Sequence, residues 1–389
     1  MSDALKHDVE AWLDQHWDSA KGCSVGEDSY DQNRWLTKVV DAGYATPTWP
    51  KEWHGLGLKS RDARVIEKAF QARGAKGWGR DRFHLGAITI FKLGSDALKT
   101  ELLYKLLTGP ICCLLYSEPG AGSDLAGIRT RAVKDGDDFI VTGQKVWTSN
   151  AEEAEYGMLL TRTDPDLPKH KGITFFIFPM KQDGVEVRPI NQITGESEFN
   201  EVFIEDARVP ERFIIGEYNQ GWKAFQTAIA SERLIMGQGI TARLSQSASK
   251  APALLRLAHK HGKLSDPVLR QDIAQALAHR QLNAMNMLRA KEEMMKNGSS
   301  SLSSLGKLAM SRIQHGEARI SAKIIGPNVL LSETEDQQNA NFDAAKAYMN
   351  SIGGGTDQIQ KNIIAERVLG LPKADDVSRN IPFKEIKSS

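Results

Sequence analysis

The sequence predicts a multidomain α+β protein in which a helical region, a small β domain and a helical bundle follow one another. Apolar residues recur at spacings of three and four before residue 112 and after residue 213, and they alternate with a period of two in between. The first pattern is typical of amphipathic helices and the second of half-buried strands. With 389 residues, the chain is long enough for several domains. We therefore expect an N-terminal helical domain over 1–111, a middle antiparallel β-barrel or sandwich over 112–213 and a C-terminal four-helix bundle over 214–389.

The N-terminal region repeats one helical pattern. Its first segment, "ALKHDVEAWLDQHW", spaces its apolar residues as one face of a helix requires: Leu5, Val9, Trp12, Leu13 and Trp17. Three further segments share the pattern and stop at or near a glycine, which is a helix stop signal: "NRWLTKVVDAGY", "DARVIEKAFQARG" and "DALKTELLYKLLTG".

The middle region reads as short strands separated by turn residues. "DDFIVTGQKVW" alternates after the turn "KDGD", and three more strands follow: "KGITFFIFPM", "GVEVRPI" and "NEVFIEDARVP". Cys112 and Cys113 open this region, and we expect both to belong to a strand core. Short strands at such spacing indicate a small antiparallel sandwich or barrel.

The C-terminal region returns to the helical period and has room for four long helices between 218 and 389. "HKH" at 259–261 is predicted to be a polar helix end rather than a metal site. His84, in "RDRFHLG", is predicted to be a satisfied surface or core histidine. "SETEDQQNANFD" is predicted to be a solvated loop because it is strongly polar.

Composition excludes several classes of protein. The net charge is +1 and the cations are scattered, which argues against nucleic acid or an anionic membrane as the main partner. No apolar run approaches the length of a membrane span, and the acidic, amphipathic first residues do not resemble a secretion signal. Three cysteines give neither a disulfide framework nor metal-ligand spacing. A cytoplasmic protein fits these observations best.

The stretch "LLYSEPGAGSDLAGIRTRA" is the first candidate binding segment. It begins as a strand and passes into a loop in which Gly120 and Gly122 let backbone amides approach a ligand, while Ser117 and Ser123 add hydroxyls. It is not a Walker loop, since no "GK[ST]" follows, and it is not "GxGxxG". Taken alone, the stretch is better explained as a simple tight turn than as a binding loop.

Two further motifs change this interpretation. "YSEPGAGSD", "GQKVWTSN" and "GGGTDQIQKNIIAERVLG" together resemble the acyl-CoA dehydrogenase family in order and spacing. The resemblance spans essentially the whole chain, including the order of helices, barrel and helices. It implies an FAD cofactor and an acyl-CoA thioester as substrate.

The resemblance also implies roles for individual residues of the first motif. The loop from Tyr116 to Ser123, including Gly122, would run along the flavin ring and ribityl chain. Ser117 matches the hydroxyl at the pyrimidine side of the ring. Ser123 matches the hydroxyl near the CoA arm of the substrate.

The other two motifs carry four more implied cofactor contacts. Trp147 matches the aromatic residue beside the dimethylbenzene edge, and Ser149 matches the hydroxyl that bonds to flavin N5. On its alternating strand alone, Trp147 would be assigned to the core. Thr356 and Gln358 match residues that touch the cofactor where the last helix begins.

The reaction also needs a carboxylate that removes the α-proton, while the flavin accepts the β-hydrogen. Many family members place this glutamate just before the final helix. Aligning "GTDQIQ" puts Gly354 at that position, and a glycine cannot act as a base.

Glu232 is the alternative base, in "WKAFQTAIASERLIMG". It follows Phe225 by seven residues and Ile229 by three, so it projects with their apolar helix face. A carboxylate there needs a pairing partner or a function, and burial would raise its pKa toward that of a general base. Taken alone, the wheel favours a structural ion pair, since Arg233 is adjacent. One branch of the family, including isovaleryl- and long-chain-type dehydrogenases, carries its base here, and Arg233 matches a residue at the substrate end of the pocket.

The resemblance implies a branched or bulky acyl group. "NQITGESEFNEVF" and "LLRLAHKHGKLSDPVLRQD" are similar to bacterial members that act on steroid or bile-acid side chains. "RKxFG", whose arginine reaches a neighbouring subunit's FAD in homotetrameric members, is replaced by "ARLSQ" with Arg243, and "GGNG" is replaced by "IIGPNVLL". These replacements leave both a homotetramer and an α2β2 heterotetramer open, and the resemblance implies an electron-transfer flavoprotein as the acceptor.

Two other functions stay open from the sequence. A flavin monooxygenase on the same fold would not need a carboxylate at Glu232. A structural subunit of a heteromeric dehydrogenase would bind FAD and take its base from a partner. The inward "SERL" argues against that subunit role, because a chain without catalytic duty need not keep a carboxylate there.

Overall fold

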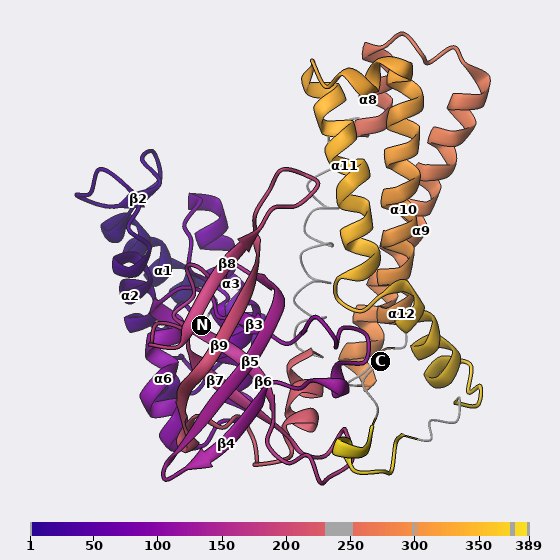
Figure 1. The fold of residues 1–389 in the computed structure, drawn as a ribbon. Coiled ribbons are helices and arrows are strands. Elements are labelled where there is room, and N and C mark those ends of the chain that lie inside the picture. The colour runs from indigo at the N-terminus through magenta and orange to yellow at the C-terminus, as the bar shows by residue number, and fades with distance from the viewer. Residues whose placement is uncertain (1, 230–251, 298–299, 301, 374–377, 387–389) are drawn as a thin grey trace. The chain divides into compact units, whose positions relative to one another are not determined.

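The computed structural model describes residues 2–229, 252–297, 300, 302–373 and 378–386 (Figure 1). The chain divides into two compact units. The first comprises Met1–Ile190, Ser197–Glu232 and Val377–Ser389, and the second comprises Asn191–Glu196 and Arg233–Asp376. The predicted three-domain division at 111/112 and 213/214 stays a prediction, since the N-terminal helices and the sheet share the first unit.

The first unit opens with helices and one short β-ribbon, β1 (Trp17–Asp18) with β2 (Cys23–Ser24). The helices are α1 (Ser2–His16), α2 (Gln32–Asp41), α3 (Ser60–Arg73), α4 (Arg80–Phe83), α5 (Leu85–Leu93) and α6 (Asp96–Thr108). The four helices predicted from periodicity are confirmed. Helices α1, α2 and α3, with the residues that follow α1 and α2, meet in an aromatic cluster of Trp12, Trp17, Trp35, Tyr44 and Phe70. Fully buried Trp35 donates its indole N–H to the carbonyl of Lys76.

A seven-stranded sheet follows the helices in the chain. Its strands are β3 (Cys113–Leu115), β4 (Arg131–Asp135), β5 (Asp138–Ser149), β6 (Tyr156–Arg162), β7 (Ile173–Pro179), β8 (Val185–Ile190) and β9 (Phe199–Pro210). The path runs β3-β6-β4-β5-β9-β8, and β7 pairs with β6 beside it. Cys112 and Cys113 are buried, as predicted, and neither forms a disulfide.

The sheet departs from the predicted antiparallel arrangement at two places. β3 pairs with β6 in parallel, and β4 meets β6 in parallel at one residue pair, Arg131 with Arg162. Between β3 and β6 the chain makes the β4–β5 hairpin, so β6 returns in the direction of β3. Parallel pairing needs such a crossover connection, which alternation within single strands does not reveal. The other pairings are antiparallel.

Polar contacts join the N-terminal helices to the residues around the sheet. Arg212, just after β9, forms an ion pair with Glu101 of α6. Arg80 donates to the carbonyls of Leu106 and Gly109 at the end of α6. Buried His84 accepts from the amide of Ala87 as the N-cap of α5, which confirms the prediction of a satisfied histidine.

In the second unit, α10 packs along both α9 and α11 (Figure 1). The described helices are α8 (Ala253–Lys260), α9 (Pro267–Asn297), α10 (Leu302–Ile325), α11 (Glu335–Ile352) and α12 (Asp357–Ile363). The core between α8, α9 and α10 is formed by Leu254, Ala258, Leu269, Ile273, Ala276, Ile320 and Ile324. Three long helices of the predicted bundle are thus in place, and the segment 218–251 that would supply the other is described only as far as residue 229.

One predicted loop is a helix. "SETEDQQNANFD" starts α11, and the prediction of a solvated loop is wrong. Thr334 caps the helix by accepting from the amide of Gln337, whose side chain in turn accepts from the amide of Thr334. This reciprocal capping box satisfies backbone N–H groups at the start of the helix. It can begin a helix in a polar segment that composition alone would assign to a loop.

The prediction that "HKH" is a polar helix end is confirmed, because α8 ends at Lys260 and His261 hydrogen-bonds to Asp336. None of the described helices is long and apolar enough to cross a membrane. In the described part of the chain, no three His, Cys, Asp or Glu side chains gather in a way that would hold a metal ion.

Candidate active site

The loop after β3 is a tight turn fixed to β5. Glu118 and Ala121 exchange two backbone hydrogen bonds of 3.1 and 3.0 Å across Pro119 and Gly120. The carbonyl of Ser117 accepts from the amide of Val146, at 2.9 Å. Backbone bonds therefore bring the "SEPGAG" and "GQKVWTSN" motifs side by side.

A buried ion pair between Glu118 and Lys145 anchors this loop. The carboxylate of Glu118 accepts from the ammonium of Lys145 at 2.8 Å and from the amides of Arg129 at 2.6 Å and Thr130 at 2.9 Å. Lys145 is fully buried and also donates to the carbonyl of Tyr116 at 3.2 Å. Burial raises the pKa of Glu118, but the Lys145 charge and these donors outweigh it and hold the pKa below its usual value. Both oxygens of the Glu118 carboxylate therefore accept hydrogen bonds, and Lys145 donates two.

Trp147 lies on a bulge of β5 in an unusual backbone conformation. Lys145 pairs with Val202 but Thr148 pairs with Asn200, so Val146 and Trp147 together oppose one residue of β9. Trp147 has φ of +61° and is 59% exposed, and its ring makes an edge contact with Phe199. Left-handed backbone is rare for a bulky residue and is concentrated at functional sites. The assignment of this side chain to the core is excluded.

The bulge also decides which neighbours face solvent. Thr148 is buried, whereas Ser149 is exposed like Trp147. On the adjoining loop Ser117 is half-buried, and Gly122 and Ser123 are exposed. Tyr116 packs its ring against Phe175 and Phe225.

Contacts with the described residues give no reason for Gly120 and Gly122 to be glycine. Neither has a positive φ, and a Cβ added to either would meet open space. Intramolecular packing and backbone strain therefore do not explain them. Close approach by a ligand is the remaining reason.

The third motif lies in the second unit, where three glycines lead into α12. Gly354 and Gly355 have φ of +67° and +88°. Thr356 caps α12 by accepting from the amide of Ile359 at 3.1 Å, and Gln358 is exposed. Gln360 is buried, and its Oε1 has no hydrogen-bond partner among the described residues.

Two predicted residues cannot be placed. Glu232 and Arg233 lie outside the described residues, as does Arg243. The helix that leads to Glu232 is described over 221–229, where Phe225 is buried and Trp222 and Ile229 are half-buried.

Comparisons with known proteins agree with the three motifs. The family model for the acyl-CoA dehydrogenase middle domain matches residues 113–207, and the model for the C-terminal domain matches residues 219–369. The acyl-CoA dehydrogenase IpdE1 of Mycobacterium tuberculosis is 32% identical over 359 residues, which cover 89% of this chain and 90% of IpdE1. The chain belongs to the acyl-CoA dehydrogenase family.

Two further similarities refine the position of this acyl-CoA dehydrogenase within the family. The acyl-CoA dehydrogenase FadE34 of the same organism is 34% identical over 86% of this chain, which spans only 46% of the length of FadE34. A solved structure, the Tcur3481-Tcur3483 steroid ACAD, aligns with a TM-score of 0.72 at 25% identity, covering 96% of this chain and 98% of that one. The predicted family, a flavin-dependent oxidoreductase, and the predicted fold class are confirmed.

Membership in this family indicates FAD as the cofactor, and the described residues of this acyl-CoA dehydrogenase fit it. Trp147 offers an exposed aromatic face, and Gly120 and Gly122 leave space at the loop that Glu118 anchors. In the other unit, near the predicted contacts Thr356 and Gln358, the buried Gln360 Oε1 accepts from no described donor. Aromatic and hydroxyl groups of this kind suit an isoalloxazine ring with polar edges.

Sequence reasoning missed Glu118 and Lys145. Both lie within the quoted motifs, yet they were not assigned a role. The available signal was a charge inside each motif: Glu118 before Pro-Gly, and Lys145 in a strand that otherwise alternates. Only the strand register shows that these two charges, 27 residues apart, form one buried pair.

Proposed function

We propose that this protein dehydrogenates an acyl-CoA thioester at its α and β carbons and forms the trans-2-enoyl-CoA. The exposed, left-handed Trp147 beside the loop that Glu118 and Lys145 anchor is the observation that carries this proposal. Strained backbone and exposed apolar side chains both concentrate at binding sites, and Trp147 combines the two. Family membership identifies that ligand as a flavin.

The chain's own residues bind and orient the cofactor in this proposal. Trp147 would lie beside the dimethylbenzene edge, Ser117 would bond to the pyrimidine side of the ring and Ser149 to N5. Thr356 and Gln358, at the start of α12, would also serve as cofactor contacts, as the family resemblance implies. Bound FAD supplies the acceptor for the β-hydrogen.

Glu232 removes the α-proton in this proposal. Gly354, which stands where many family members have the base, offers no side chain. Ser123 contacts the CoA arm and Arg233 holds the substrate end of the pocket. A general base of this kind contributes about 10²–10⁴-fold to the rate.

The substrate class is a CoA thioester with a bulky acyl group such as a steroid side chain. Similarity to a steroid ACAD supports this class. The sequence features "NQITGESEFNEVF" and "LLRLAHKHGKLSDPVLRQD" point in the same direction.

The proposed assembly is a tetramer, either of one chain or of two kinds of chain, with an electron-transfer flavoprotein as electron acceptor. The name of the similar steroid ACAD joins two components, which supports a tetramer of two kinds of chain. Light scattering of the protein expressed alone and with its genomic neighbour distinguishes the two tetramers.

The deciding experiment is anaerobic bleaching of the bound flavin by straight-chain, branched and steroid-derived acyl-CoA thioesters. Glu232→Gln is compared with the wild type and with Glu217→Gln, which removes an exposed carboxylate earlier in the chain. We expect bleaching by a bulky thioester in the wild type and in Glu217→Gln. In Glu232→Gln the rate should fall about 10²–10⁴-fold at equal FAD content.

Other outcomes have definite meanings. Equal bleaching in all three proteins removes Glu232 from the mechanism. FAD binding without bleaching by any thioester favours a subunit that needs a partner chain. Rapid reaction of the reduced flavin with oxygen, with no need for Glu232, favours a monooxygenase.

A further inference from the structure

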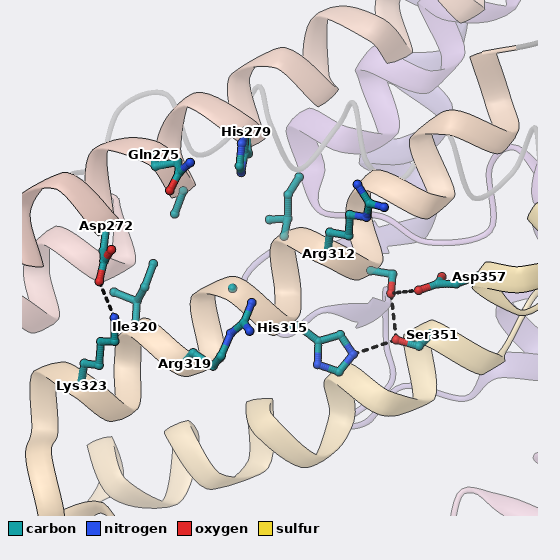
Figure 2. Close-up of a pocket in the computed structure, with 14 residues that line it drawn as sticks. Asp272, Gln275, His279, Arg312, His315, Arg319, Ile320, Lys323, Ser351 and Asp357 are labelled. Carbon is teal, nitrogen blue, oxygen red and sulfur yellow. Dashed lines mark hydrogen bonds and ion pairs between the residues drawn. The ribbon is translucent and has the colours of Figure 1, made fainter. Parts of the chain in front are cut away.

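A groove of about 580 Å³ lies in the second unit, between α9, α10, the end of α11 and the start of α12 (Figure 2). One face of α10 supplies Arg312, Gly316, Arg319 and Lys323 at spacings of four, three and four residues. This is the helical repeat, so the four residues line one side of the groove from end to end. None of them belongs to the predicted flavin or substrate contacts.

The charges in this groove are unevenly satisfied. Lys323 donates to Asp272 at 2.7 Å, and Asp357 accepts from Ser311 at 2.8 Å and is 3.3 Å from Lys307. Arg312 and Arg319 have no ion pair or hydrogen bond with any described residue, and Figure 2 shows both guanidinium groups in the groove without a partner. Both acids are neutralised, so the two arginines leave a net positive groove.

Gly316 gives a second, independent observation. It lies in the interior of α10, where glycine is less favourable than alanine. Its φ is not positive, and an added Cβ would meet nothing within 4 Å. No packing or backbone requirement within the described residues explains a glycine there. It keeps the helix backbone open to the groove between the two arginines.

The size and lining of the groove indicate what it binds. Arginines seven residues apart start about 10 Å apart along the helix, which suits an anion longer than one phosphate. Guanidinium groups bind phosphate oxygens through paired hydrogen bonds. Ala276, Ile313 and Ile320 add an apolar side. The volume falls within the range of small-molecule sites and exceeds what a single phosphate needs.

We propose that this groove binds the adenosine diphosphate portion of a nucleotide, with Arg312 and Arg319 on the diphosphate. FAD and coenzyme A both contain this chemical group. The identity of the nucleotide rests on the proposed function, whereas the diphosphate chemistry rests on the groove itself.

The test measures binding to full-length protein in two arms. In the first, FAD-loaded protein is diluted and the FAD dissociation constant is obtained from the fluorescence of released flavin. In the second, coenzyme A is titrated calorimetrically into FAD-loaded protein. The variants are Arg312→Gln/Arg319→Gln, which removes the charges, and Gly316→Leu, which fills the groove without changing charge. Arg289→Gln removes an exposed arginine of α9 outside the groove and is the matched control.

We expect one of the two dissociation constants to rise about tenfold per arginine in the double variant. It should rise in Gly316→Leu as well, and the control should match the wild type. A change in the FAD arm assigns the groove to the cofactor, and a change in the coenzyme A arm assigns it to the substrate. If both constants stay at the control values in both variants, with thermal unfolding showing intact folds, the proposal is overturned.

The two proposals fail separately. Protein that bleaches with no thioester but shows either change in binding keeps the groove and loses the dehydrogenase activity. Normal bleaching with unchanged binding supports the dehydrogenase activity and overturns the groove proposal.

Discussion

Lys145 is a fully buried charge, and the stability of the active-site loop depends on its partner. Removing one member of a buried, hydrogen-bonded pair leaves the other uncompensated, which costs about 3–5 kcal/mol. We expect Lys145→Met to lower the free energy of unfolding by about this amount, and Glu118→Gln to lower it in the same direction. Urea unfolding followed by tryptophan fluorescence measures both.

An exposed pair of the same two residue types provides the control. Lys134 and Glu211 interact at 2.8 Å with half-exposed side chains, so Lys134→Met should cost at most about 1 kcal/mol. Equal losses for Lys134→Met and Lys145→Met would contradict the role given to burial.

Trp147 should behave oppositely to a core tryptophan. Glycine at this position removes a left-handed backbone cost of about 1–2 kcal/mol and adds glycine's entropy cost of about 0.5–1 kcal/mol. The unfolding free energy of FAD-free Trp147→Gly should therefore stay within about 1 kcal/mol of the wild type, while FAD binds more weakly. Trp35→Ala, at a fully buried position, should cost about 3–5 kcal/mol. A Trp147→Gly loss as large as that of Trp35→Ala would mean that Trp147 is a packing residue.

His84 predicts sensitivity to mild acid. Burial, with a contribution from the Arg80 charge, lowers the pKa of His84 to about 3 in the folded protein. The unfolded chain takes up this proton near pH 6.5, so the stability is fully present above that pH and falls as the pH drops toward 3. Between pH 7 and pH 5, the wild type should lose ~2 kcal/mol more than His84→Asn, which retains a capping side chain. Parallel urea curves at the two pH values test this; equal losses would contradict it.

Single residues show which parts of the site the sequence could predict. Trp147 and Ser117 came from motifs, because a family motif fixes position in the chain directly. The Glu118–Lys145 pair depends on how β3 and β5 approach each other, and no local pattern specifies that distance. Alternation alone predicts a buried Trp147, but the side chain is exposed because a bulge in β5 breaks the period of two.

Among the helices, α11 tests whether its capping box stabilises the fold. Thr334→Ala removes the acceptor for the Gln337 amide and should cost about 1 kcal/mol, whereas Thr334→Ser keeps the hydroxyl and should cost little. Thermal unfolding of the three proteins gives the comparison. Equal melting temperatures for the alanine and serine variants would show that the cap is not needed.

Helices and strands with strong periodicity were predictable, and those governed by other signals were not. α1, α2, α3 and α6 carry apolar residues at helical spacing, so they match their predicted segments. The first turns of α11 are held by Thr334 and Gln337 and have little apolar periodicity to reveal them. The parallel pairing of β3 with β6 depends on the path of the intervening hairpin.

For the chain as a whole, the most telling surface is on α9. Leu282, Met285 and Leu288 are each more than half exposed on this helix. Apolar residues grouped on one helix commonly mark an interface. If the protein forms the proposed tetramer through this surface, Met285→Lys should shift it to a smaller species in light scattering. Gln271→Lys, at an exposed polar position of the same helix, should leave the assembly unchanged. An unaltered Met285→Lys assembly would exclude the α9 surface.

The order of helical and β regions followed from periodicity because that pattern is local. The assembly did not follow, because partner contacts depend on surfaces that only the folded units present. "RKxFG" and "GGNG" are missing from the chain, and their absence said nothing about where Arg312 and Arg319 would gather on α10.

The backbone at Gly354 affects which residues this position can accept. Its surroundings have room for a side chain, but its φ of +67° makes any residue with a Cβ costly by about 1–2 kcal/mol. A glutamate restored here by one mutation would meet no clash and would still be disfavoured by the backbone. A carboxylate at this position would therefore have to overcome a backbone cost that a carboxylate on a helix does not meet. The conformation of the turn before α12 thus favours glycine at position 354, whatever residue acts as the base.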